Sequence, residues 1–115
     1  MVFGMSSEYV QVTTAAETKE AATTLAGSAV RARLAASAQV VGPITSVYWH
    51  LGEYGESDEY MVVLKTTLER YPALEAHLIK NHPWENAEIV AVPFAAGAPN
   101  YLAWIKDTVA ESAEQ

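Results

Sequence analysis

The sequence predicts a single small α+β domain in which helices pack on an antiparallel sheet. The length of 115 residues fits one domain with one hydrophobic core. Half of the residues are apolar, which is typical of a globular chain. Segments with alternating apolar residues are interleaved with segments of helical spacing, in the order β-α-β-β-α-β followed by one further helix.

The first strand and the first helix are expected within residues 9–34. Val10 and Val12 alternate with polar residues over 9–14, as on one face of a strand. Residues 14–17 are Thr, Ala, Ala and Glu, a capping-box pattern that predicts the start of a helix there. Apolar residues at helical spacing form the expected face of this helix: Ala22, Leu25, Ala26, Ala29, Val30 and Leu34.

A long hairpin is expected next. Residues 38–51 and 59–67 are rich in β-branched and aromatic residues, and Gly42-Pro43 should produce a bulge or an unpaired edge position. Residues 52–59 hold two glycines and four acids, which indicates the connection between the strands.

The length of this hairpin predicts an oligomer. A continuous strand over residues 38–54 would span about 50 Å at about 3.3 Å per residue, whereas a compact domain of this size is about 35 Å wide. The overhanging part carries Tyr48, Trp49, Leu51 and Tyr54. Exposed apolar side chains on such a hairpin favour cover by another subunit, so we expect Tyr48, Trp49 and Tyr54 at a subunit interface.

The second half of the chain supplies a helix, a strand and a last helix. A helix is expected from about Tyr71, with Pro72 in its first turn, to about His82, followed by a strand over 88–94. Pro99 opens the last helix. The complete order is that of a ferredoxin-like fold with an extra C-terminal helix. We expect residues 8–110 to form the domain, with a flexible segment at 1–7 and a flexible tail at 111–115.

Composition excludes several classes of partner. Seven basic and fourteen acidic residues give a net charge of −7, which disfavours nucleic acid and anionic membrane surfaces. The absence of cysteine excludes disulfides and thiolate metal sites and fits a cytoplasmic location. No apolar run approaches the roughly 20 residues of a membrane helix.

The residues do not predict an enzyme. The nucleophile elbow, the Walker loop and the dinucleotide fingerprint are all missing from the sequence. Trp49 and Tyr101 could line a pocket, although aromatic residues at sheet–helix contacts are more often core or interface. Lys65 stands in an otherwise apolar strand, where it requires an exit to solvent or an anionic partner, which would be either a ligand or a buried ion pair between subunits.

Two stretches could bind a cation. His82 and Glu85 could supply nitrogen and oxygen ligands, whereas the favoured interpretation of His82 is a cap on the helix C-terminus. The acidic residues of the hairpin could attract cations, but acidic hairpin tips more often serve solubility.

Five motifs resemble a known family. They are Arg33-Leu34-Ala35-Ala36, Ser46-Val47-Tyr48-Trp49, Leu64-Lys65-Thr66, His82-Pro83-Trp84-Glu85 and Tyr101-Leu102-Ala103-Trp104-Ile105. In order and spacing they are similar to the CutA divalent-cation-tolerance proteins. The resemblance implies a homotrimer of ferredoxin-like subunits, assembled like the PII signalling proteins, with a role linked to divalent metals such as copper.

The departures from the family pattern affect which metal ion the chain is expected to bind. Ser37 stands where the family commonly has a cysteine, and Asn81 where some members have a second histidine. His50 and Glu53 replace an aromatic residue and a lysine that often follow the Tyr-Trp pair. Without thiolates, the expected cofactor is at most copper(II) or zinc, bound through His82 and Glu85. The alternative is a PII-like sensor or scaffold that holds a small anionic molecule in clefts between subunits, near Lys65, Trp49 and Tyr101.

Overall fold

The computed structural model describes residues 7–110, and the expectations for residues 1–6 and 111–115 lie outside this range. Its elements are β1 (Tyr9–Ala16), α1 (Lys19–Arg31), β2 (Ser37–His50), β3 (Glu53–Thr67), α2 (Tyr71–Asn81), β4 (Val90–Pro93) and α3 (Pro99–Val109). The predicted order β-α-β-β-α-β with an additional helix is confirmed. The four strands form one antiparallel sheet in the order β2-β3-β1-β4, which is the ferredoxin-like arrangement.

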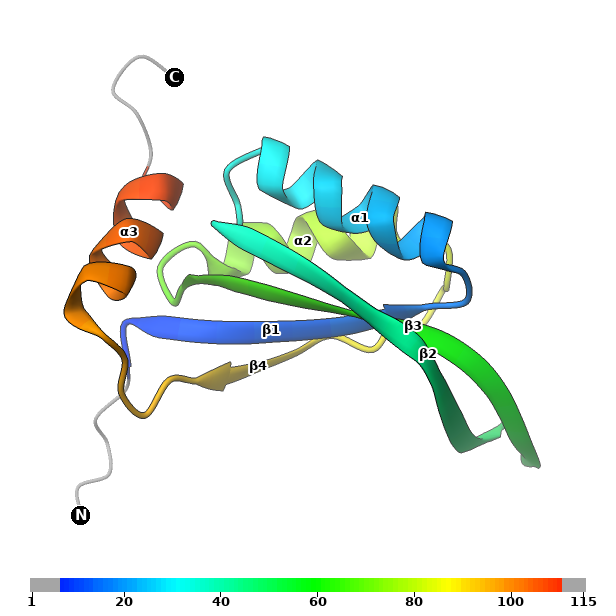
Figure 1. The fold of residues 1–115 in the computed structure, drawn as a ribbon. Helices are drawn as coiled ribbons and strands as arrows, with labels where there is room; N and C mark the ends of the chain where they lie inside the picture. Colours follow the sequence, from blue (N-terminus) through cyan, green and yellow to red (C-terminus); the bar gives the residue numbers. More distant parts are fainter. Residues whose placement is uncertain (1–6, 111–115) are drawn as a thin grey trace.

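The main core lies between one face of the sheet and the helices α1 and α2, which cover that face together (Figure 1). Strand alternation directs Val10, Val12, Val62 and Leu64 into this layer, where they are at most 2% exposed. The helices contribute Ala22, Leu25, Ala26, Ala29, Leu74 and Leu78. The predicted apolar face of the first helix is thus the buried one, although Leu34 lies beyond the end of α1.

The start of α1 differs from the capping-box prediction. Thr14 belongs to β1 and is completely buried, and the helix instead begins after Thr18, whose Oγ1 accepts a hydrogen bond from the amide of Ala21 at 3.0 Å. Residues 14–17 have the sequence of a capping box. However, Thr14 pairs with Val62 and Ala16 pairs with Tyr60, so these residues continue strand β1. Tertiary strand pairing therefore overrides the local helix signal.

The hairpin connection is much shorter than predicted. Its turn consists of Leu51 and Gly52 alone, both with positive φ, and residues 53–59 belong to β3. A two-residue turn with two positive φ angles matches the right-handed twist of the flanking strands. The predicted irregularity at Gly42-Pro43 is present as a register shift between Val41 and Ile44.

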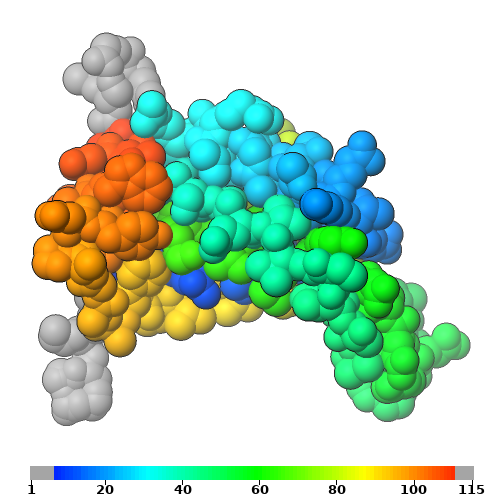
Figure 2. All heavy atoms as spheres, viewed as in Figure 1, coloured from blue at the N-terminus to red at the C-terminus, as the bar shows by residue number. Residues whose placement is uncertain are grey.

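The hairpin extends well beyond the two helices, as predicted from its length (Figure 1). In the space-filling view it projects as an arm from the body of the molecule (Figure 2). Its strands pair with each other over the full arm, from Ile44 with Glu59 to His50 with Glu53. The arm is therefore a two-stranded ribbon without a helix packed on it.

Helix α3 lies at the end of the sheet opposite the arm (Figure 1). It rests on an apolar cluster separate from the main core, in which Ala36, Ile105 and Val109 are buried and Tyr9, Phe94 and Leu102 pack around them. The guanidinium of Arg33 donates a hydrogen bond to the carbonyl oxygen of Thr108 at 3.1 Å, close to the C-terminal end of α3. None of the helices in the described range is long and apolar enough to cross a membrane.

Candidate functional site

His82 occupies the position after the last residue of α2 and is 8% exposed. Its Nδ1 accepts a hydrogen bond from the amide of Trp84 at 3.0 Å. Nδ1 therefore carries the lone pair, and the proton resides on Nε2, which donates to the carbonyl oxygen of Ala15 at 2.7 Å. The ring also lies against Trp84, with ring centroids 5.0 Å apart. His82 thus joins the end of α2 to the end of β1.

This geometry does not provide the metal site expected at His82 and Glu85. Both imidazole nitrogens of His82 are engaged within the chain, so neither offers a lone pair to a metal. Glu85 is exposed and makes no hydrogen bond to His82. Among residues 7–110, no three histidine, aspartate or glutamate side chains are grouped so as to hold a metal ion. The favoured interpretation of His82, a cap on the C-terminus of α2, is closer to the observed geometry. However, the ring contacts β1 rather than the last carbonyls of α2.

The predicted interface residues lie on the arm and are open to solvent in the single subunit. Trp49 is 75% exposed, and its ring contacts that of Tyr54 edge to face at a centroid separation of 6.2 Å. Tyr48 lies across Gly55, where a Cβ would meet the ring at 2.7 Å, and its hydroxyl donates to Ser57 Oγ at 3.1 Å. The arm therefore presents a set of ordered aromatic rings that its own subunit does not cover.

Lys65 lies on the face of the sheet that α1 and α2 leave open. It alternates with the buried Leu64 and pairs with Gln11 of β1 and Ser37 of β2. The same face carries Val41, Val90 and Val92, which are about half exposed. Lys65 is partly buried, and its side chain makes no hydrogen bond or ion pair with another described residue.

Tyr101 lies on α3, where its ring stacks on Trp104 at a centroid separation of 5.8 Å. Both side chains are more than 40% exposed. Because α3 and the tip of the arm lie at opposite ends of the molecule (Figure 1), Tyr101 and Trp49 do not line one pocket within a subunit. A ligand site that contains Lys65, Trp49 and Tyr101 would need more than one copy of the chain.

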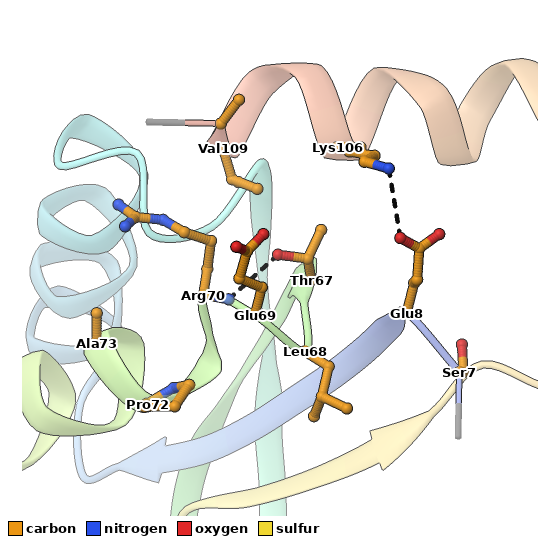
Figure 3. Close-up of a pocket in the computed structure, with 11 residues that line it drawn as sticks. Ser7, Glu8, Thr67, Leu68, Glu69, Arg70, Pro72, Ala73, Lys106 and Val109 are labelled. Atoms are coloured by element: carbon orange, nitrogen blue, oxygen red, sulfur yellow. Dashed lines mark hydrogen bonds and ion pairs between the residues drawn. The ribbon is translucent and has the colours of Figure 1, made fainter. Parts of the chain in front are cut away.

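The described range contains a groove that the sequence did not indicate (Figure 3). It has a volume of about 790 Å³ and lies between the start of β1, the turn from β3 to α2, and α3. Lys106 Nζ forms an ion pair with Glu8 Oε2 at 3.3 Å, and the hydrogen bond to Glu8 raises the pKa of Lys106. On the opposite wall, Thr67 Oγ1 accepts from the amide of Arg70 at 3.2 Å. These groups come from three distant segments, so no sequence motif could reveal the groove.

Comparison with known proteins gives a consistent result. Residues 10–108 match the family described as CutA1 divalent ion tolerance protein. The chain is 38% identical over 100 residues to the Thermus thermophilus divalent-cation tolerance protein CutA, covering 87% of this chain and 95% of that protein. It is 37% identical over 94 residues to the chloroplastic protein CutA 1 of Oryza sativa, of which it spans only 53%.

Solved structures give the same picture. The structure of the divalent cation tolerance protein from Thermus thermophilus superposes with a TM-score of 0.84 at 35% identity, over 87% of this chain and 97% of that one. CutA1 from Oryza sativa superposes with a TM-score of 0.87 at 34% identity, over 93% and 98% of the two chains. With the family match over residues 10–108, these similarities show that the chain belongs to the CutA1 divalent ion tolerance family.

Proposed function

We propose that this protein contributes to tolerance of divalent cations, as a homotrimer with a binding role rather than a catalytic one. The observation that carries the proposal is the family match over residues 10–108, together with relatives named for divalent-cation tolerance. We place the protein in the cytoplasm as part of this proposal, with cysteine-free composition as the supporting observation.

Exposed apolar surface supports the oligomer. On the arm, Val47, Trp49, Leu51 and Tyr54 are 59–89% exposed. The open face of the sheet adds Val41, Val90 and Val92. Exposed apolar side chains in this number mark an interaction site in a folded protein. A second copy that packs its arm against the open face of the sheet would cover both the arm and that face. The family resemblance implies that the number of subunits is three.

Metal binding is the finer part of the proposal. The chain has no thiolate, so its ligands for copper(II) or zinc must be imidazole nitrogen and carboxylate or carbonyl oxygen. Both ring nitrogens of His82 are hydrogen-bonded, to Ala15 and to Trp84. The ligands of the ion must therefore be side chains that are more exposed than His82. We therefore expect weak binding that is lost in acid, because imidazole must be neutral to coordinate.

A second candidate function is binding of a small anionic molecule between subunits. The observation that favours it is Lys65 on the open sheet face, beside Gln11 and Ser37. Its side chain is partly buried and has no partner among residues 7–110. A thermal-shift screen of nucleotides and organic anions tests this function directly. A stabilising compound should lose its effect on Lys65→Ala, and a compound that stabilises both proteins equally would argue against Lys65 as its contact.

Two measurements test the leading proposal. Light scattering at low micromolar concentration should give about three times the subunit mass of 12.5 kDa, and a mass near 12.5 kDa would rule out the trimer. Deletion of the gene should reduce growth of its host in excess copper or zinc, with rescue by the intact gene. Unchanged growth under every divalent cation tested would contradict the tolerance role.

A further inference from the structure

The tip of the arm places an imidazole opposite a carboxylate. His50 is the last residue of β2, Glu53 is the first residue of β3, and the two are direct partners in the sheet register. Only Leu51 and Gly52 separate them, with φ angles of 51° and 81°. A two-residue turn of this type fixes the register of the residues that flank it.

The register brings the two side chains within reach of one ion. Side chains of directly opposed residues lie on the same face, with Cβ atoms about 4.5–5.5 Å apart. Trp49 and Tyr54 form the next pair, so alternation directs them to the other face. Two ligands of one metal, each about 2.0–2.2 Å from it, are separated by about 3 Å, a distance that His50 and Glu53 can reach by rotation of their side chains.

His50 is also the histidine with both ring nitrogens available. His82 uses both nitrogens, and Nε2 of His77 lies 2.9 Å from Ser28 Oγ, which already donates to Leu25. Within residues 7–110 the side chains of His50 and Glu53 form no hydrogen bond or ion pair, and both residues are exposed. By contrast, Glu56 accepts from the Tyr54 hydroxyl at 2.6 Å, and Glu59 accepts from Ser46 at 2.8 Å.

We propose that His50 and Glu53 form a two-ligand clip for copper(II), and more weakly for zinc, at the tip of the arm. One imidazole nitrogen and one carboxylate oxygen suit these ions, and copper(II) binds such donors more tightly than zinc does. Water completes the coordination. The negative charges of Glu56 and Asp58 on the same ribbon raise the local concentration of cations. The inference rests on the proposed role in divalent-cation tolerance, to which it adds the residues that bind the ion.

Calorimetric titration of the full chain with copper(II) and zinc tests the clip. We expect one copper(II) per subunit, with affinity lowered at least about tenfold in His50→Ala and by a smaller factor in Glu53→Gln. His77→Ala and Glu20→Gln are matched controls, since they remove a histidine outside the clip and an exposed carboxylate of α1 away from the arm, and each should keep the parent affinity. Electron paramagnetic resonance should show nitrogen coordination of copper(II) that disappears in His50→Ala.

Three outcomes would overturn the clip. The first is a parent chain that binds neither ion. The second is a copper(II) affinity that is unchanged in His50→Ala, or lowered equally in His77→Ala. The third is an unchanged copper(II) affinity in Glu53→Gln, because the site would then have one ligand, the imidazole of His50, and not two. Light scattering and circular dichroism of the same variants should match the parent, since both side chains are exposed. The titration and the growth experiment can disagree. If the chain binds copper(II) through the clip but deletion of the gene leaves growth of the host unchanged, the clip is supported and the tolerance role is contradicted.

Discussion

The imidazole Nε2 of His82 lies 2.7 Å from the carbonyl oxygen of Ala15, so the end of α2 is tied to the end of β1 across 67 positions of sequence. His82→Ala removes this buried bond together with the acceptor for the Trp84 amide. We expect the free energy of unfolding to fall by about 1–3 kcal/mol, the usual cost of a buried polar group that loses its partner. Denaturant unfolding measures this, with the exposed His50→Ala as a control that should change stability by less than about 0.5 kcal/mol.

The same variant decides the metal role first suggested by the sequence. Because both nitrogens of His82 are already bonded, His82→Ala should leave copper(II) and zinc titrations unchanged. Loss of metal binding in His82→Ala with the fold intact would restore His82 as a ligand.

Trp49→Ala should weaken the assembly rather than the subunit. Trp49 is 75% exposed in the single chain, so its removal costs the isolated fold little. If a neighbouring subunit buries the ring completely, truncation costs about 3–5 kcal/mol per interface. Light scattering and thermal unfolding should then show a smaller mass at low concentration and a lower melting temperature. Ile79→Ala, which truncates an exposed residue of α2, should leave the mass unchanged. An unchanged mass and melting temperature in Trp49→Ala would show that the ring is not an interface anchor.

Two buried threonines should respond in opposite directions to valine. Thr14 and Thr66 are both completely buried. Thr66 Oγ1 donates to the carbonyl oxygen of Leu34 at 2.7 Å, whereas Thr14 Oγ1 has no hydrogen-bond partner among the described residues. Thr14→Val should therefore raise the free energy of unfolding by about 1 kcal/mol, and Thr66→Val should lower it by about 1–3 kcal/mol. Equal destabilisation of the two variants would show that the Thr14 hydroxyl is satisfied.

Tyr71 should make the fold sensitive to alkali. Burial raises its pKa to about 12, and its hydrogen bond to Glu75 at 2.7 Å and the charge of Glu75 act in the same direction. An unfolded tyrosine has its ordinary pKa near 10, so above that pH the unfolded chain loses this proton before the folded chain does. The stabilisation is complete below about pH 10 and is lost as the pH rises towards about 12.

Melting temperatures between pH 9 and pH 12 measure this effect. Tyr71→Phe should show a shallower decline than the parent across the upper part of the range. Tyr101→Phe removes a hydroxyl without a hydrogen bond in the described range and should decline like the parent. Parallel curves for the parent and Tyr71→Phe would contradict the assignment.

Strand periodicity and helix spacing predicted most of the fold. The buried faces of β1 and of α1 follow from Val10 and Val12 and from the alanines and Leu25, because side chains on one face recur at fixed intervals. The acids and glycines of residues 52–59 predict a connection, since their composition is that of a turn. Their pairing with residues 44–50 makes them a strand, and such pairing depends on long-range register.

The candidate sites could be predicted less well. The sequence identified His82 as a residue of special chemistry, but the partner that defines its role, Ala15, is separated from it by 67 positions. The pairing of His50 with Glu53 depends on a turn of only two residues, whereas the composition of the sequence predicts a longer connection. The expected pocket of Lys65, Trp49 and Tyr101 combined residues whose positions in space could not be derived from spacing along the chain.

Because the apolar cluster beneath α3 is separate from the main core, we expect the molecule to contain two cooperative units of unequal stability. Ile105 and Val109 of α3 meet a small set of neighbours apart from the main core, and an ion pair of two largely exposed side chains, Lys106 and Glu8, adds little. Amide hydrogens of α3 should therefore exchange with solvent through a partial opening, well before those of β1 and β3, which exchange only when the whole sheet unfolds. On this expectation the chain releases the helix α3 while its sheet stays intact.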